Sequence, residues 1–120
     1  MLSRPQPITI IGAGLNGPLL GLSLAKRRLP VAIYERRPDM RRVRIDTGRS
    51  INLALSTRGI HALQKAGLWD SLRNLIIPMK GRMMHSIAGE LTFQPYGKDE
   101  AEVINSISRA ALNVALMNAA

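Results

Sequence analysis

Cysteine is absent from this sequence of 120 residues, and aromatic residues make up only 3% of it. The first absence excludes disulfides, zinc–thiolate centres and cysteine nucleophiles. The second leaves the aliphatic residues and methionine to build a core, for which a hydrophobic content of 46% is sufficient. We therefore expect one domain or a part of one.

Long apolar runs are also missing. No stretch near the N-terminus is long enough for a signal peptide or a membrane span, so a cytoplasmic protein without a membrane segment is expected. The two histidines, His61 and His85, lack the spacing of metal ligands and are interpreted as structural or exposed, so no metal site is expected.

Positive charge dominates, with a net charge of +9, and it is concentrated in one stretch. Residues 26–49 hold nine basic and three acidic residues, which is a net +6. Nucleic acid is not the expected partner, because no aromatic residues for base stacking lie between the basic ones. A phosphate-bearing ligand, an acidic partner surface or an ordinary solvated loop would each account for the charge.

The first part of the chain predicts a βαβ unit over residues 7–35. An apolar, β-branched run predicts a strand at 7–12, and a second strand is expected at 31–35. Between them a leucine-rich pattern predicts a well-buried helix over 16–28. Pro18 is tolerated there because the first helical turn does not need its N–H.

The remaining pattern alternates short strands and helices. A polar, arginine-rich loop is expected at 36–49, Ser56 is a plausible N-cap, and Gly67 is a helix stop. The other expected elements are a strand at 50–55, helices at 56–65 and 68–75, an antiparallel strand pair at 80–86 and 90–94, a strand at 103–105 and a helix at 109–119 capped by Ser108. Core positions are expected for Met79, Met83 and Met84. The last helix has no stop signal, which suggests a truncated sequence.

The strongest chemical signal is the G-x-G-x-x-G sequence that starts at Gly12. Gly12 permits a tight turn, Gly14 lets the backbone approach a pyrophosphate, and Gly17 allows the helix to pack closely on the strand. The pyrophosphate would sit at the helix N-terminus, where N–H groups and the helix dipole favour anions. Glu35 ends the second strand, where an acidic side chain can bind a ribose diol.

This unit alone leaves the dinucleotide open. An NAD-dependent Rossmann dehydrogenase fragment is one alternative, and a non-catalytic dinucleotide-binding module is another. A simple Rossmann half would continue with a helix and a third parallel strand after Glu35. The basic loop and the antiparallel pair that follow instead favour a flavoprotein.

Four further segments resemble the kynurenine 3-monooxygenase family, the class A aromatic hydroxylases that use FAD and NADPH. They are Gly48–Ser56 with Arg58-Gly59, Pro78–His85, Gln94–Gly97, and Ile107–Arg109 with Leu112-Asn113. The resemblance covers essentially the whole chain. It implies that residues 1–120 are the N-terminal part of an α/β, Rossmann-like FAD-binding domain of the glutathione-reductase-like type. That domain would be incomplete here, with a small antiparallel strand pair on the substrate side.

The resemblance also implies binding residues, but no catalytic residue of the acid–base kind. Contacts with FAD are implied for Gly12, Gly14, Leu15, Asn16, Gly17, Glu35, Arg36, Arg37, Ala54 and Arg109. Arg82 and Tyr96 match the pair that binds L-kynurenine, which the family converts to 3-hydroxykynurenine in tryptophan degradation. From the residues alone, Arg82 and Arg109 fit a solvent-exposed position and Tyr96 an ordinary turn tyrosine as well.

For the 120 residues in isolation we expect weak or no FAD binding and no turnover. Later family segments that touch FAD and cover the substrate are not in the sequence. Open strand edges and apolar helix faces also make homo-oligomers plausible. A vestigial reading frame with a real fold but an incomplete site is a further alternative.

Overall fold

The computed structural model describes residues 6–43, 51–99 and 101–120. Its elements form three small sheets, with strand orders β1-β2, β3-β7-β4 and β5-β6. In chain order the elements are β1 (Ile8–Ile11), α1 (Asn16–Ala25), β2 (Val31–Tyr34), β3 (Asn52–Leu55), α2 (Thr57–Ala66), α3 (Trp69–Leu72), the 3₁₀ turn η1 (Arg73–Leu75), β4 (Ile76–Met79), β5 (Gly81–His85), β6 (Leu91–Pro95), β7 (Ile104–Ser108) and α4 (Arg109–Ala119). The fold is therefore α/β with antiparallel strand pairs, as expected.

Strands β1 and β2 form a parallel pair that α1 connects. The register runs from Ile8 opposite Val31 to Ile11 opposite Tyr34. The helix approaches this pair closely because it presents a glycine. A Cβ atom added to Gly21 would lie only 2.7 Å from Cδ1 of Ile33 in β2.

The prediction that this helix is well buried is wrong. Only Pro18 and Gly21 are buried in α1, while Leu20 is 51% exposed. A sheet of two strands is too narrow to cover a whole leucine-rich surface. The helix is also shorter than expected, because Arg28 has a φ of 61°, in the left-handed region, just beyond its end.

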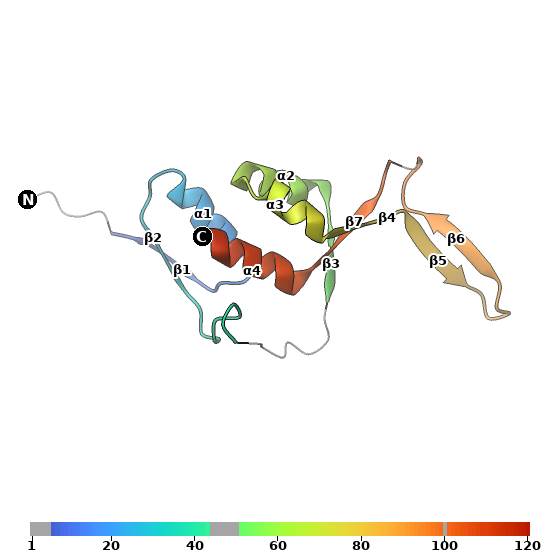
Figure 1. Cartoon of the computed structure of the whole chain (residues 1–120), viewed down its shortest axis with the longest axis horizontal. Coiled ribbons are helices and arrows are strands. Elements are labelled where there is room, and N and C mark those ends of the chain that lie inside the picture. The colour runs from blue at the N-terminus through green and yellow to red at the C-terminus, as the bar shows by residue number, and fades with distance from the viewer. Residues whose placement is uncertain (1–5, 44–50, 100) are drawn as a thin grey trace, which may run out of the picture.

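The main core lies between the β3-β7-β4 sheet and the helices. Its buried members come from α2, α3, β7 and α4, and they are Leu63, Leu72, Ile107, Leu112 and Leu116. Leu15 and Leu19 also pack against this cluster, which joins the parallel pair to the antiparallel sheet. Figure 1 shows α1 and α4 side by side in this central region.

Three predicted helix boundaries are confirmed by their caps. The Ser56 hydroxyl accepts a hydrogen bond from the Gly59 N–H at the start of α2, and Gly67 ends that helix with a φ of 73°. The Ser108 hydroxyl accepts from the Ala111 N–H at the start of α4. Each cap depends on neighbours within a few residues, which is why the sequence pattern predicts it.

Strand β4 was not expected, and its residues lie between the predicted helix at 68–75 and the predicted strand at 80–86. Pro78 pairs with Asn105 of β7. β4 is an edge strand of its sheet, and an edge is where proline can lack an N–H without breaking a ladder. β7 itself is longer than the expected 103–105 and extends to Ser108, since it pairs on both sides.

The β5–β6 hairpin projects away from the helices (Figure 1). Its register pairs Gly81 with Pro95 and His85 with Leu91, as the predicted antiparallel pair requires. The expected core positions of Met83 and Met84 are wrong, because these side chains are 52% and 48% exposed. An isolated hairpin has two faces and no third layer in which to bury them.

Candidate functional site

The glycine-rich turn has the shape that its three glycines predict. Gly12 has a φ of 104° and its N–H donates to the Tyr34 carbonyl at 2.7 Å. A Cβ atom on Gly17 would collide with the Gly12 carbonyl oxygen, so only glycine lets α1 start this close to β1. A Cβ atom on Gly14 would meet nothing within 4 Å, so the turn is open on that side.

Helix α1 begins at this turn without a side-chain cap. Its N-cap residue is Leu15, which cannot accept a hydrogen bond, and its first turn holds no acidic residue. Asn16, the first helical residue, is exposed. The first N–H groups of a helix lack intrahelical acceptors. The positive end of α1 is therefore available to an anion.

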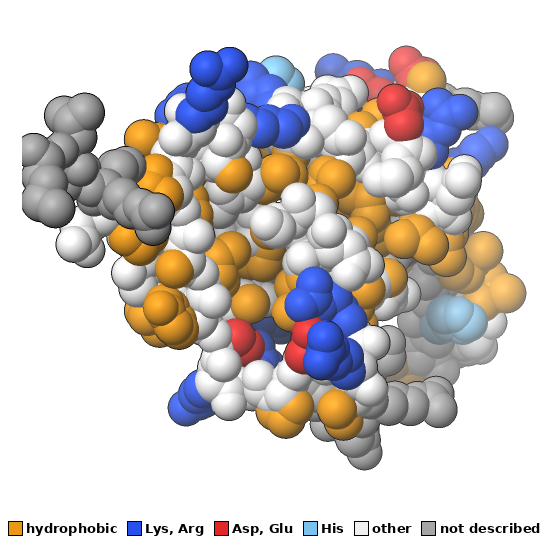
Figure 2. Space-filling model, turned by 60° about the vertical axis from the view of Figure 1, so that its left-hand side comes forward, with side chains coloured by type: hydrophobic (Ala, Val, Ile, Leu, Met, Phe, Trp, Pro, Cys, Tyr) orange, Lys and Arg blue, Asp and Glu red, His pale blue; other side chains and the backbone are white. Residues whose placement is uncertain are grey.

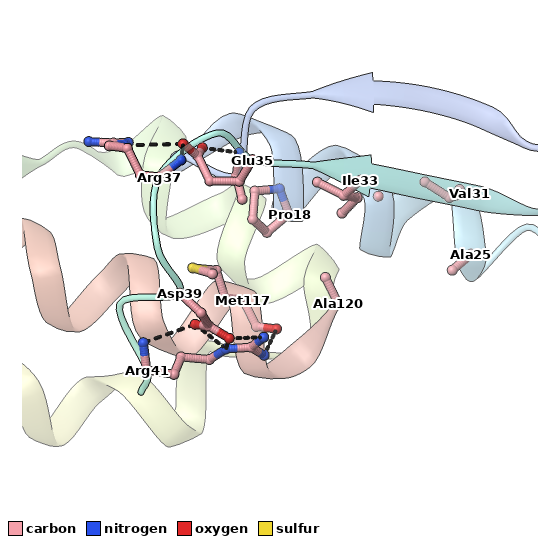
Figure 3. Close-up of a pocket in the computed structure, with 12 residues that line it drawn as sticks. Pro18, Ala25, Val31, Ile33, Glu35, Arg37, Asp39, Arg41, Met117 and Ala120 are labelled. Atoms are coloured by element: carbon pink, nitrogen blue, oxygen red, sulfur yellow. Dashed lines mark hydrogen bonds and ion pairs between the residues drawn. The ribbon is translucent and has the colours of Figure 1, made fainter. Parts of the chain in front are cut away.

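Glu35 closes the turn from the end of β2. Its Oε2 atom accepts from the Ala13 N–H at 2.8 Å, and its Oε1 atom accepts from the Arg37 N–H at 3.0 Å and from Arg37 Nε at 3.2 Å. These bonds, with the Ala13 amide as the largest influence, lower the pKa of Glu35 to about 2. The carboxylate is thus ionised at neutral pH and fixed against the turn (Figure 3). Arg36 and Arg37, the other two predicted residues here, are both exposed.

The basic loop holds a second ion pair, and the arginine of that pair also hydrogen-bonds to α4. Arg41 binds Asp39 through Nη2 at 2.8 Å, and its Nη1 atom donates to the Met117 carbonyl at 3.1 Å. The hydrogen bond from the Arg41 side chain is the main reason that the pKa of Asp39 falls to about 2. Two arginines of the predicted loop at 36–49 therefore bind neighbouring carboxylates, Arg37 that of Glu35 just before the loop and Arg41 that of Asp39 within it.

A pocket of about 500 Å³ lies beside this loop. Its floor is apolar and comes from α1 and β2, and its rim carries the two ion pairs. The lining residues are Ala13, Pro18, Gly21, Ala25, Val31, Ile33, Glu35, Arg37, Asp39, Arg41, Met117 and Ala120. Figure 2 shows acidic and basic side chains gathered at a hollow that hydrophobic side chains surround.

Asn113 was not among the predicted site residues, although it belongs to one of the segments that resemble the family. This side chain of α4 is 7% exposed, and its Nδ2 atom donates to the Ala13 carbonyl at 3.0 Å. One feature of the sequence could have identified Asn113 in advance. It is a polar residue on the buried side of a helix, next to Leu112 and three residues before Leu116.

The predicted flavin contacts Ala54 and Arg109 lie on the antiparallel sheet and at its junction with α4. Ala54 is exposed in β3 and pairs with Ser106 of β7. Arg109 is the first residue of α4, and its N–H donates to the Ile51 carbonyl at 3.2 Å. The Arg109 side chain is exposed, and its role toward a ligand stays a prediction.

The predicted substrate residues lie on the projecting hairpin. Arg82 is opposite Gln94, and its Nε atom donates to Gln94 Oε1 at 2.8 Å. The Tyr96 N–H donates to the Lys80 carbonyl at 3.0 Å, which continues the ladder beyond β6. Tyr96 lies just beyond the end of β6, two residues from Gln94. The structure therefore places both residues on or next to the hairpin, apart from the glycine turn (Figure 1).

The part of the chain that the structure describes contains neither a metal-binding cluster nor a membrane-spanning helix. Among its residues no three metal-binding side chains gather into a group that could hold an ion. Within the same ranges, no helix has the length and hydropathy needed to cross a membrane. The predicted residues Gly48 to Ser50 of the first family segment lie outside the described residues.

Comparison with known proteins gives a consistent family signal. No family model matches the chain. It is 54% identical over 118 residues to kynurenine 3-monooxygenase from Myxococcus xanthus (strain DK1622), which is 98% of this chain and 25% of that protein. It is 52% identical over 116 residues to kynurenine 3-monooxygenase from Xanthomonas euvesicatoria pv. vesicatoria (strain 85-10), which is 97% of this chain and 26% of that protein.

A solved structure also aligns with the chain. It is a crystal structure described provisionally as an FAD-containing monooxygenase from Photorhabdus luminescens subsp. laumondii TTO1. The TM-score is 0.66 at 26% identity, over 90% of this chain and 27% of that one. The resemblance expected from the motifs is thus confirmed, and the chain spans about a quarter of the length of the curated relatives it matches.

Proposed function

We propose that this chain, a relative of the kynurenine 3-monooxygenases over about a quarter of their length, forms the dinucleotide-binding part of a flavin-dependent monooxygenase. Its βαβ unit would be of the Rossmann-like, glutathione-reductase-like type. The observation that carries the proposal is the open glycine turn at the uncapped start of α1, with Glu35 bound against it.

The residues of the turn fit the diphosphate of FAD. The backbone can be approached closely at Gly14, and the start of α1, at the half-buried Leu15 and the exposed Asn16, would offer N–H groups to phosphate oxygens. Gly12 and Gly17 would shape this cradle rather than touch the ligand through side chains. An anion here needs no basic side chain, because the helix dipole and the N–H groups supply the positive potential.

Glu35 fits the adenosine ribose. Each carboxylate oxygen has two lone pairs, so Oε2 can accept a ribose hydroxyl and keep the Ala13 N–H. Arg37 already holds Oε1, and the exposed Arg36 lies next to it. Ala54 and Arg109 would contact the flavin end of the same cofactor from the antiparallel sheet.

When bound, FAD would supply the redox and oxygen chemistry, with NADPH as the reductant and co-substrate. The chain's own residues would bind and orient. On the hairpin, Arg82 would hold the α-carboxylate of L-kynurenine by two parallel hydrogen bonds and Tyr96 would add a third. The product of the whole enzyme would be 3-hydroxykynurenine.

A polypeptide of these 120 residues alone is expected to bind FAD weakly and to show no turnover. The proposed substrate pair lies on a hairpin that projects away from the glycine turn (Figure 1), so the two half-sites do not meet. The apolar side chains Ile11 and Tyr34, at the ends of β1 and β2, are 81% and 60% exposed. They favour self-association of this polypeptide.

The NAD-dependent dehydrogenase is the less favoured alternative. A plain Rossmann half would add a third parallel strand after β2, whereas the next strand, β3, enters an antiparallel sheet. The relatives are named as monooxygenases, and the aligned crystal structure is described as containing FAD.

An equilibrium titration tests the choice of dinucleotide. FAD fluorescence is followed as the chain is added, and NAD is then offered as a competitor. FAD quenching that saturates and resists an equal concentration of NAD supports the proposal. Displacement of FAD by NAD at that concentration would favour the dehydrogenase, and quenching without saturation would contradict a defined site.

A further inference from the structure

Asn113 is a buried polar side chain in an otherwise apolar setting. It is 7% exposed and belongs to the same buried side of α4 as Leu112 and Leu116. Its Nδ2 atom donates to the Ala13 carbonyl at 3.0 Å across a sequence separation of 100 residues. The sulfur atoms of Met40 and Met117 also lie near Nδ2, at 3.1 Å and 3.2 Å.

The chemistry of these three contacts singles out one of them. A buried amide costs stability unless it is hydrogen-bonded, so an apolar residue would fill this place at lower cost if packing were its only purpose. Thioether sulfur is a weak acceptor, whereas a backbone carbonyl is a strong one. The bond to the Ala13 carbonyl therefore accounts for an asparagine at this position.

With this bond, both backbone polar groups of Ala13 in the glycine turn are hydrogen-bonded to side chains. The Ala13 N–H is taken by Glu35, and the Ala13 carbonyl is taken by Asn113. The peptide bonds here are trans, so the Gly14 N–H points opposite to the Ala13 carbonyl. By holding that carbonyl toward α4, Asn113 fixes the direction in which the Gly14 N–H points.

We propose that Asn113 is a positioning residue for the dinucleotide, one that sets the Ala13–Gly14 peptide in the orientation that receives a phosphate. The proposal rests on the function proposed above. Arg109 lies four residues earlier on α4, so it shares the helix that this bond fixes to the turn. Asn113 thereby also fixes the placement of Arg109, on the flavin side, relative to Gly14, on the diphosphate side.

The first test needs no ligand and no substitution. In ¹H–¹⁵N spectra of the chain, the side-chain amide of Asn113 is compared with that of Asn118, which is exposed on the same helix. Slower hydrogen exchange at Asn113, by about fivefold or more for a net bond of ordinary strength, supports the proposal. Equal exchange at the two side chains would overturn it.

The second test asks whether the bond acts on the turn. Asn113→Leu keeps the branching at Cγ and removes the donor, and Asn118→Leu is the matched control. The exchange rate of the Ala13 amide is expected to rise about fivefold in the first variant and to stay unchanged in the second. An unchanged Ala13 amide in folded Asn113→Leu would contradict the proposal.

A purely structural role is separated by a third variant. Leu112→Ala removes buried volume next to Asn113 and lowers the unfolding temperature, but leaves both bonds of Ala13 in place. In this variant the hydrogen-exchange rate of the Ala13 amide is expected to rise less than the rates of other core amides. If the exchange rate of the Ala13 amide also rose selectively in Leu112→Ala, any loosening of α4 would open the turn. That result would overturn a specific role for Asn113.

FAD affinity then links the bond to the proposed function. A dissociation constant raised about fivefold in Asn113→Leu, with Asn118→Leu unchanged, is the expected result. Unchanged affinity for FAD in Asn113→Leu would overturn the positioning role and leave the proposed function standing. Absence of FAD binding by the unsubstituted chain would count against the proposed function instead, and the exchange data would still decide whether Asn113 holds the turn.

Discussion

The glycine turn and the β5–β6 hairpin carry the two groups of predicted site residues, but different interactions hold them. Ala13 in the turn is bound by Glu35 from β2 and by Asn113 from α4, across separations of 22 and 100 residues. Arg82 in the hairpin is bound by Gln94, twelve residues away in the partner strand. The turn is shaped by the whole fold, whereas the hairpin is shaped by itself.

The glycine turn is therefore fixed by contacts from other parts of the fold, whereas the predicted substrate residues of the hairpin have no such contacts among the bonds described above. The turn presents an open side at Gly14 and the uncapped start of α1. Arg82 lies in the hairpin and Tyr96 just beyond its second strand, and Figure 1 shows the hairpin far from the turn. The proposed dinucleotide site can therefore be tested on the glycine turn alone, whereas the proposed substrate residues lie away from it.

The largest expected effect is on the free energy of unfolding, and it is measured by replacing one leucine in each region. Leu116 is 2% exposed in the main core, so Leu116→Ala should lower the free energy of unfolding by about 3 kcal/mol. Leu91 is 63% exposed in β6, so Leu91→Ala should change it by less than about 0.5 kcal/mol. Urea unfolding followed by circular dichroism gives both values. Equal losses would mean that the hairpin is part of the core.

A smaller effect separates two glycines of the turn. Gly17→Ala puts a Cβ atom against the Gly12 carbonyl oxygen and should destabilise the fold by about 2 kcal/mol, as overpacking does. Gly14→Ala adds its Cβ in open space and should leave stability nearly unchanged. By the proposed function it should still weaken FAD binding, because the methyl group occupies the diphosphate side. Similar unfolding curves for the two variants would contradict the described turn.

The pH dependence of stability tests the Glu35 contact. Its pKa is lowered to about 2 in the folded chain, so the ionised carboxylate stabilises the fold above the ordinary value of 4.5. That contribution is lost as the pH falls from 4.5 through about 2. The unfolding temperature of Glu35→Gln should therefore lie below that of the unsubstituted chain at pH 7, and the gap should close toward pH 2.

The control for this experiment is Glu90→Gln, at the start of the hairpin's second strand, where Glu90 is exposed. The unfolding temperature of Glu90→Gln should change with pH in the same way as that of the unsubstituted chain between pH 7 and pH 2. Asp39 keeps its own lowered pKa in all three proteins, so its contribution cancels from the comparison. A gap between Glu35→Gln and the parent that stays constant down to pH 2 would contradict the assignment.

The smallest expected effect is on the hairpin itself. Arg82→Gln removes an exposed hydrogen bond to Gln94 and should change the free energy of unfolding by less than about 0.5 kcal/mol. Its FAD affinity should equal that of the parent, because Arg82 lies away from the turn. A loss of more than about 1 kcal/mol, again by urea unfolding, would show that the hairpin is not energetically separate.

The sequence predicted best where a signal and its partner are close together. The caps at Ser56, Gly67 and Ser108 each act within a few residues, and all three are confirmed. The Gly12 turn and the place of Glu35 after the second strand were predicted from a spacing that the βαβ unit fixes, whereas the hydrogen bond from the Ala13 N–H to Glu35 was not predicted. The hairpin register follows equally from local alternation.

Other features depended on what packs against an element, which no local pattern reveals. Leu20 and Met83 look like core residues by type, but the sheets beside them are too small to bury them. Pro78 is tolerated in a strand only because β4 lies at an edge. The Asn113 bond joins positions 100 residues apart, so only the fold could disclose it.

The most direct test of the central claim is an FAD titration of the ¹⁵N-labelled chain followed in ¹H–¹⁵N spectra, which detects weak binding. The account predicts saturable shifts of the Gly14, Leu15 and Asn16 amides and of Glu35, with the β5–β6 amides unmoved. Shifts confined to the hairpin, or no saturable shift at the glycine turn, would contradict the claim that this turn binds the dinucleotide.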